Sequence, residues 1–436
     1  MPSSQADTPV ARPGSHRRRS PAPERRSRGD LVAGALLGVL ALGAAVGFAA
    51  TSDAAHTTSA PAATPIAAPP QAGSVPAAFR MAWRAPSGAT RTPVVVGDAV
   101  VTGAGGTVTG RAATDGAAAW TYERDRPLCA VGAAFTAVED AQRVLALYRD
   151  GEWCSELTAL RPDTGVRAAA RNPDLRPGTA FVSNGTLVAG TGAEKIEVMR
   201  YDLVRTLEYG RLDAPVNPGV QPRPQCTHAG TALGPDRLAV LERCPGEPTD
   251  RLTLLDPDDT KDGKPEVRWS KPLAASGAGL VAITETRIAV VLPDPARIVV
   301  LDEQGGEVGT YPVDVPPAAL AAAADPPGGL PATGHDARQI SWWTGTSTIL
   351  LDPGTLAPIA TVPDTLGPGC SYGDATLVPV PGGLAVLGRD ASGADPVVRT
   401  IPVARTDRSA PMRLATQGAV LVEQRGDEIV ALVPAG

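Results

Sequence analysis

The run Ile298-Val-Val-Leu-Asp-Glu-Gln-Gly305 places a short apolar segment directly before a polar turn. Similar runs stand at 158–165, 251–257 and 348–354, where an apolar segment again leads into aspartate, proline, threonine or glycine. Short apolar runs bounded by turn residues are typical of antiparallel strands joined by hairpins. The recurrence predicts a repeated β unit, with looser copies at 110–116, 198–203, 399–404 and 428–434.

The spacing of these eight copies predicts how the units are arranged. They follow one another at about 45 residues, which suits four short strands with their hairpin loops. Such units close into a β-propeller, because blades around an axis leave no long sheet edge exposed. We therefore expect residues 79–436 to form an all-β, eight-bladed propeller, with seven blades as the alternative. Because the last spacing is short, we expect residues 413–434 to complete their blade with an outer strand from residues 79–85.

The composition agrees with turn-rich β structure. The 436 residues include 47 glycines and 44 prolines, which break helices and exclude a helical bundle. Hydrophobic residues make up 43%, enough to bury a core, so a wholly disordered chain is also excluded. Only 4% of residues are aromatic. Trp83, Trp120 and Trp269 each follow a polar turn, and we expect these rings to pack between neighbouring blades.

Residues 31–50, LVAGALLGVLALGAAVGFAA, contain no charge and are long enough to span a membrane as a helix. A cleaved secretory signal is the alternative, but about 30 polar residues precede the segment, and signal peptides begin with a shorter basic stretch. Seven arginines make residues 1–30 basic, and basic flanks stay cytoplasmic. We expect a disordered cytoplasmic tail over 1–30 and an extracytoplasmic location for everything after residue 50. Topology explains the arginines, so nucleic-acid binding is not expected.

Residues 51–78 differ in composition from both neighbours. They are rich in alanine, proline and threonine and carry a single charge at Asp53. Proline favours extended backbone, so such a segment serves as a spacer. The sequence predicts a linker that holds the 79–436 domain away from the bilayer. Within that domain, Asn184-Gly185 between two apolar runs predicts a type I′ hairpin turn.

The first repeat carries a family resemblance. Thr92-Pro-Val-Val-Val-Gly-Asp-Ala-Val-Val101, followed by 106–116 and Trp120, resembles the first repeat of PQQ-like β-propellers. That family includes quinoprotein dehydrogenases and the outer-membrane assembly factor BamB. With its basic start and single span, the chain is similar to membrane-anchored propellers of actinobacteria. The resemblance implies eight blades and the general fold, and it does not imply enzyme activity.

Five cysteines lie after the apolar segment, on the side where disulfides are permitted. Cys129 and Cys154 fall within one repeat and Cys226 and Cys244 within another, each pair flanking a hairpin. We expect two disulfides, Cys129–Cys154 and Cys226–Cys244. Cys370 is left over. We expect it to be a buried thiol, with a reactive thiol or an intermolecular bridge as alternatives.

Motifs for catalysis and for cofactors are missing from the sequence. The family's dehydrogenases carry adjacent cysteines at the quinone and acidic residues for calcium, and this chain has no Cys-Cys pair. The acidic segment 256–263 does not match a calcium-loop template, the four histidines form no zinc motif, and there is no Gly-x-Ser-x-Gly elbow. We therefore predict no catalytic, cofactor-binding or metal-binding residues. The histidines are His16, His56, His228 and His335.

These observations lead to a functional expectation. We expect a single-pass, membrane-anchored propeller that is not an enzyme and that acts as a binding or scaffold protein of the cell envelope. It would present its rim or channel mouth to a protein or cell-wall partner outside the membrane. The alternative is an extracytoplasmic enzyme or small-ligand binder that uses the central channel, where loops from every blade converge. Fold alone does not decide between them.

Overall fold

The computed structural model describes residues 27–215, 217–261, 263–336, 338–388, 396–405 and 411–435. The chain divides into two compact units, Met1–His56 and Thr57–Gly436, and each is described by itself. The first holds helix α1 and the second holds all of the described strands.

Helix α1 spans Arg28–Ala50 and contains the predicted apolar segment. It begins three residues earlier than expected because Ser27 caps it: the backbone N–H of Asp30 donates to Ser27 Oγ, and the Asp30 carboxylate accepts from the Ser27 backbone N–H. Arg28 to Asp30 therefore belong to the helix and not to a disordered tail. The helix is long and apolar enough to cross a membrane. Residues 1–26 of the expected tail lie outside the described residues.

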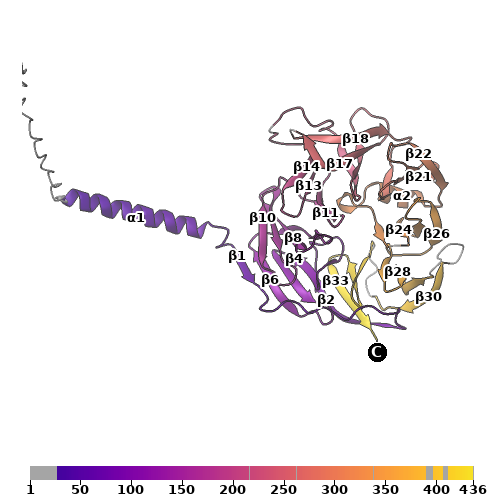
Figure 1. Ribbon diagram of the computed structural model, residues 1–436, viewed down its shortest axis with the longest axis horizontal. Coiled ribbons are helices and arrows are strands. Elements are labelled where there is room, and N and C mark those ends of the chain that lie inside the picture. Colours follow the sequence, from indigo (N-terminus) through magenta and orange to yellow (C-terminus); the bar gives the residue numbers. More distant parts are fainter. Residues whose placement is uncertain are drawn as a thin grey trace, which may run out of the picture. The chain divides into compact units, whose positions relative to one another are not determined.

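The second unit is an eight-bladed β-propeller (Figure 1), which confirms the predicted fold class and excludes seven blades. Each blade is an antiparallel sheet of four strands, and blade 1 carries a fifth. Blade 1 has β3 (Val94–Val96), β4 (Ala99–Ala104), β5 (Thr107–Ala112), β6 (Ala118–Arg124) and the added β1 (Thr57–Ala60); blade 2 has β7 (Leu128–Ala134), β8 (Arg143–Asp150), β9 (Trp153–Leu160) and β10 (Arg167–Arg171). Blade 3 has β11 (Ala180–Ser183), β12 (Val188–Thr191), β13 (Lys195–Met199) and β14 (Arg205–Gly210); blade 4 has β15 (Thr227–Leu233), β16 (Leu238–Arg243), β17 (Arg251–Lys261) and β18 (Lys264–Pro272).

The second half of the ring repeats this pattern. Blade 5 has β19 (Gly279–Ile283), β20 (Ile288–Pro293), β21 (Ala296–Leu301) and β22 (Glu307–Pro312); blade 6 has β23 (Thr333–His335), β24 (Ile340–Trp343), β25 (Thr348–Leu351) and β26 (Pro358–Val362). Blade 7 has β27 (Cys370–Tyr372), β28 (Ala375–Val380), β29 (Gly383–Leu387) and β30 (Val397–Pro402); blade 8 has β31 (Arg413–Gln417), β32 (Val420–Arg425), β33 (Glu428–Pro434) and β2 (Phe79–Pro86). The core consists of apolar clusters packed between these sheets.

The ring closes through strand β2, which comes before blade 1 in the chain. It forms the outer strand of blade 8, antiparallel to β33, with Phe79 opposite Pro434 and Pro86 opposite Glu428. This confirms the expected pairing of an early strand with the final blade. The strand completes the four-stranded sheet of blade 8 and joins the two ends of the domain in one sheet, which closes the ring.

Three tryptophans link neighbouring blades, as the sequence analysis expected. The indole N–H of Trp120 in blade 1 donates to Pro162 O in the last turn of blade 2, at 2.9 Å. Trp83 makes the same contact from blade 8 to blade 1, and Trp269 makes it from blade 4 to blade 5. The ring of Trp120 lies on Gly165, whose φ is +72° and where a Cβ would approach the ring to 2.6 Å. Glycine is therefore required there by both its backbone and its close contact.

The predicted type I′ turn at Asn184-Gly185 is wrong. Gly185 has a φ of +94°, but Asn184 is not among the residues with positive φ. The loop instead contains four residues between β11 and β12, and Asn184 Oδ1 accepts backbone N–H groups of Thr186 and Leu187. The loop therefore forms an Asx turn, in which the asparagine side chain accepts the backbone hydrogen bonds, in place of the expected type I′ turn.

Residues 57–78 of the expected linker lie against the propeller. Strand β1 pairs with β6, and the Ile66 side chain is buried in the core cluster of blade 1. Further along, Pro70 O accepts the backbone N–H of Ala419 in blade 8, and Val75 O accepts from Arg399 in blade 7. The segment is extended, as its prolines favour, but its small apolar side chains pack on the blades. Residues 57–78 therefore belong to the folded propeller unit.

Candidate functional site

A cavity of about 400 Å³ runs along the propeller axis. It is lined by the first strands of seven blades, which converge there because each sheet begins at the axis: β3, β7, β11, β15, β19, β23 and β31. Most lining side chains are small or apolar, such as Ala133, Ala180 and Leu233. Small side chains at the narrow centre of the ring leave space open, and this space is the candidate site.

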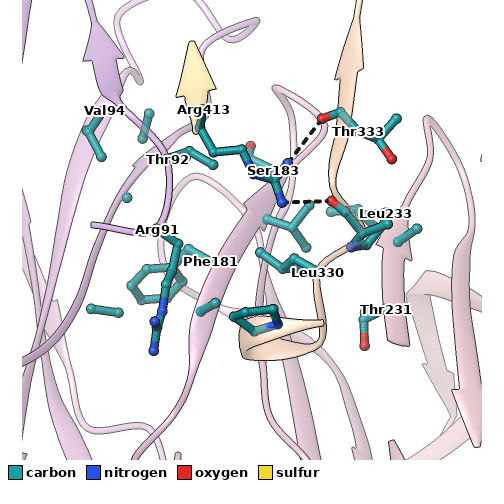
Figure 2. Close-up of a pocket in the computed structure, with 18 of the residues that line it drawn as sticks. Arg91, Thr92, Val94, Phe181, Ser183, Thr231, Leu233, Leu330, Thr333 and Arg413 are labelled. Atoms are coloured by element: carbon teal, nitrogen blue, oxygen red, sulfur yellow. Dashed lines mark hydrogen bonds between the residues drawn. The ribbon is translucent and has the colours of Figure 1, made fainter. Parts of the chain in front are cut away.

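Two arginines provide the positive charge of this cavity (Figure 2). Arg413, at the start of β31, donates from Nη2 to Pro331 O at 3.2 Å and from Nη1 to Thr333 O at 3.5 Å. Burial lowers the pKa of Arg413 to about 10, so its guanidinium stays charged at neutral pH. Arg91 is exposed and points away from Arg413 in Figure 2. No aspartate or glutamate is among the described residues that line the cavity.

An insertion between blades 5 and 6 reaches the axis. It contains helix α2 (Pro317–Ala324) and the 3₁₀ turn η1 (Pro327–Gly329). Thr191 Oγ1 of blade 3 donates to Gly328 O at 2.8 Å, and Arg243 Nη2 of blade 4 donates to Ala324 O at 2.7 Å. A Cβ at Gly328 would lie 2.8 Å from the Cβ of Ala180, so only glycine allows this approach. The insertion thus ties blades 3 and 4 to the segment that joins blades 5 and 6.

Beneath α2 lies a second cavity of about 300 Å³, here called the side cavity. Its walls are mainly apolar and include Leu280, Ala322, Trp342 and Trp343. Arg413 lines both this cavity and the axial one, as do Pro327, Pro331 and Pro411. A charged group therefore lies in the wall shared by the two cavities, both of which are lined mainly by apolar residues.

The cysteines form the two expected pairs. Cys129 is bonded to Cys154 within blade 2, and Cys226 is bonded to Cys244 within blade 4. Cys370, on β27, is a free thiol that is partly buried. Burial, together with the nearby charges of Glu423 and Asp336, raises the pKa of the Cys370 thiol. A thiol with a raised pKa is a poor nucleophile at neutral pH.

The two histidines of the propeller occupy different environments. His228 is buried, stacks on Tyr209 and has Nδ1 3.1 Å from Gly192 O. Burial lowers the pKa of its imidazole. His335 is exposed at the wall of the axial cavity, and partial desolvation there lowers its pKa as well, so both rings are neutral at pH 7. A neutral imidazole adds no positive charge to the cavity.

One group of metal-ligating atoms occurs among the described residues, at Cys226, Glu242 and Cys244. Its two sulfurs are joined in a disulfide, and Glu242 is already bonded to Arg223 at 3.1 Å and to Tyr209 at 2.6 Å. These contacts make the group part of a buried hydrogen-bond network between blades 3 and 4 and not a metal site. The acidic segment at 256–263 falls partly outside the described residues, and Asp256 within it pairs with Arg268 at 3.1 Å.

The residues of the axial cavity do not fit the quinone and calcium of the dehydrogenases that share this fold. Calcium binds oxygen ligands, chiefly carboxylates. The described lining contains no carboxylate, and its charged groups are arginines. The chain also has no adjacent cysteine pair. No quinone chemistry is derived for this protein.

Sequence reasoning did not single out Arg413, the insertion or the side cavity. The lining residues come from seven blades and are far apart in the chain, and each is an ordinary residue in its own strand. The Ala-rich run after Pro316 is the one local signal that could have indicated α2, because proline at a helix start and alanine within it both favour helix.

No protein-family model matches the chain, and no curated protein matches it. Among solved structures, it is similar to the quinohemoprotein alcohol dehydrogenase ADHIIG from Pseudomonas putida HK5, with 11% identity, 86% of this chain and 79% of that chain covered, and a TM-score of 0.51. It is also similar to the dihydro-heme d1 dehydrogenase NirN, with 13% identity, 87% and 76% coverage, and a TM-score of 0.49. The first similarity shows the propeller fold, and it carries no activity to this chain.

Proposed function

We propose that this protein is a single-pass membrane protein of the cell envelope whose extracytoplasmic propeller binds a small ligand in the axial cavity and does not transform it. Helix α1 supports the anchoring, because it is uncharged from Leu31 to Ala50. The arginines before it support the orientation, because basic flanks stay cytoplasmic. A further protein or cell-wall partner, and membership of the actinobacterial membrane-anchored type, stay predictions.

The observation that carries the proposal is the chemistry of the cavity wall. It combines about 400 Å³ of space with two arginines and no carboxylate among its described residues. Hydrolysis or proton transfer generally uses a titratable group whose pKa lies near the working pH. Arg413 stays protonated at pH 7, and His335 is neutral with a lowered pKa. A wall with two cationic groups and no carboxylate among its described residues favours the binding of an anion.

Native mass spectrometry of the full chain tests ligand binding. The protein is extracted from its own membranes in mild detergent, and the wild type is compared with Ala133→Phe, whose ring fills part of the axial cavity. We expect a small-molecule adduct on the wild type and its loss in the variant. An unliganded wild type, also after incubation with a small-molecule extract of the same cells, would contradict the proposal.

Cysteine labelling in intact cells tests the orientation. Ser59 is exposed on β1, and a Ser59→Cys variant should react with a membrane-impermeant maleimide without lysis. A Ser20→Cys variant should react only after lysis. The wild type is the control, since its free Cys370 is partly buried and has a raised pKa. The reverse labelling pattern would refute the orientation.

A further inference from the structure

Arg413 has hydrogen-bonding capacity that the protein does not use. A guanidinium carries five N–H donors, and Arg413 directs one from each Nη nitrogen at a main-chain carbonyl. The residue lines both the axial cavity and the side cavity, where the remaining donors are available to a ligand. The planar fork of a guanidinium matches a carboxylate, which can accept two parallel hydrogen bonds.

Arg413 also lacks a counter-ion among the described residues. No described carboxylate lies within ion-pair distance of it, and burial is the cause of its lowered pKa, with no acidic group opposing the shift. Arg413 is half-buried, and arginines buried elsewhere in the ring are paired: Arg405 lies 2.6 Å from Glu423, and Arg124 lies 2.6 Å from Glu156. A desolvated charge without a partner is costly, and a bound anion would offset that cost.

The lining of the side cavity limits the chemistry of any ligand group that extends into it from Arg413. Its walls are formed by Leu280, the alanines of α2 and two tryptophans, and the indole N–H of Trp343 already donates to Thr365 O at 3.1 Å. These walls provide apolar area and flat ring surfaces, with few free polar groups. The only acidic residue in its described lining is Asp325, which is exposed. Asp325 would repel a second anionic group at that end.

We propose that the ligand is an organic monocarboxylate with a flat apolar body, whose carboxylate binds Arg413 and whose body enters the side cavity beneath α2. This inference rests on the proposed ligand-binding function and names its ligand class. The insertion between blades 5 and 6 determines the specificity, because it forms one wall of the apolar compartment.

Fluorescence titration of the full chain in detergent tests the inference with two matched probes. 2-Naphthoate carries the charge and the flat body, and 2-naphthamide keeps the body without the charge. We expect the wild type to bind naphthoate at least about tenfold more tightly than naphthamide, because hydrogen bonds between charged groups are stronger than neutral ones. In Arg413→Gln the two probes should bind equally.

Arg297→Gln is the matched control. Arg297 also donates to two main-chain carbonyls, those of Asp294 and Pro295, but it lines neither cavity. This variant should keep the preference for naphthoate. Ala322→Trp fills the side cavity without altering Arg413 and should weaken naphthoate binding at least about tenfold through lost apolar contact.

The possible outcomes separate the ligand class from the function. Equal binding of the two probes by the wild type, or a preference that survives in Arg413→Gln, would overturn the inference. If Arg413→Gln fails to fold, as judged by its melting curve, Ala322→Trp and Arg413→Lys decide, and unchanged naphthoate binding in both would overturn it. A native adduct that is lost in Ala133→Phe but not displaced by naphthoate would refute the ligand class and leave the proposed function standing.

Discussion

Replacing Gly165 by alanine should destabilise the propeller through the contact between blades 1 and 2. Gly165 has a φ of +72°, and a left-handed backbone costs an alanine about 1–2 kcal/mol. The new Cβ would also lie 2.6 Å from the Trp120 ring, which is 1% exposed and cannot move freely. Overpacking of a core typically costs about 1–3 kcal/mol. We therefore expect Gly165→Ala to lower the free energy of unfolding by about 2–5 kcal/mol.

Gly151→Ala separates the two contributions. Gly151 has a φ of +60°, but nothing lies within 4 Å of its added Cβ, so we expect a loss of only about 1–2 kcal/mol. The assay is urea unfolding of the full chain in detergent, followed by tryptophan fluorescence. Equal losses for the two variants would refute the view that the tryptophan contact between blades stabilises the ring.

Three further predictions concern other parts of the propeller. Replacing both Cys226 and Cys244 by serine opens a link across 18 residues and should cost about 3 kcal/mol, measured by denaturant unfolding; an unchanged midpoint would show that this disulfide is dispensable. His228 is buried with a lowered pKa, so the unfolded chain binds its proton first, and stability should fall as pH drops below about 6.5. Melting curves at pH 7 and 5 check this, and His228→Gln should show a smaller fall than the wild type; an equal fall would assign the effect to other groups. Ile66→Ala should cost about 2–5 kcal/mol, because this side chain is buried on blade 1, whereas Ala63→Gly at an exposed position nearby should cost less than about 1 kcal/mol. Equal effects in unfolding curves would mean that residues 57–78 do not pack on the propeller.

The fold could be predicted because its signal recurs. Each blade repeats short apolar strands with turn residues at the same places, so degenerate copies such as 399–404 still count toward the period. Closure by residues 79–85 followed from a simple physical need, since the last blade had too few residues for four strands. The linker was harder to predict. Its prolines indicate extended backbone, but they do not reveal that Ile66 finds a buried site on blade 1.

The candidate site could not be predicted from the sequence. Arg413 is one of many arginines in the chain, and only the ring brings it beside the insertion and Trp342. The lining residues of the axial cavity are too small and too ordinary to form a motif. The sequence did show which groups are missing. Because it has no adjacent cysteine pair and no metal-binding motif, its resemblance to a family that includes dehydrogenases implied the fold and not the activity.

The central claim is that the axial cavity holds a small anionic ligand. A high-resolution electron cryomicroscopy map of the full chain, purified from its own membranes, tests this most directly. The account predicts non-protein density that contacts the Arg413 guanidinium and extends toward Trp342. Water alone beside Arg413, or a protein carboxylate paired with it, would contradict the claim.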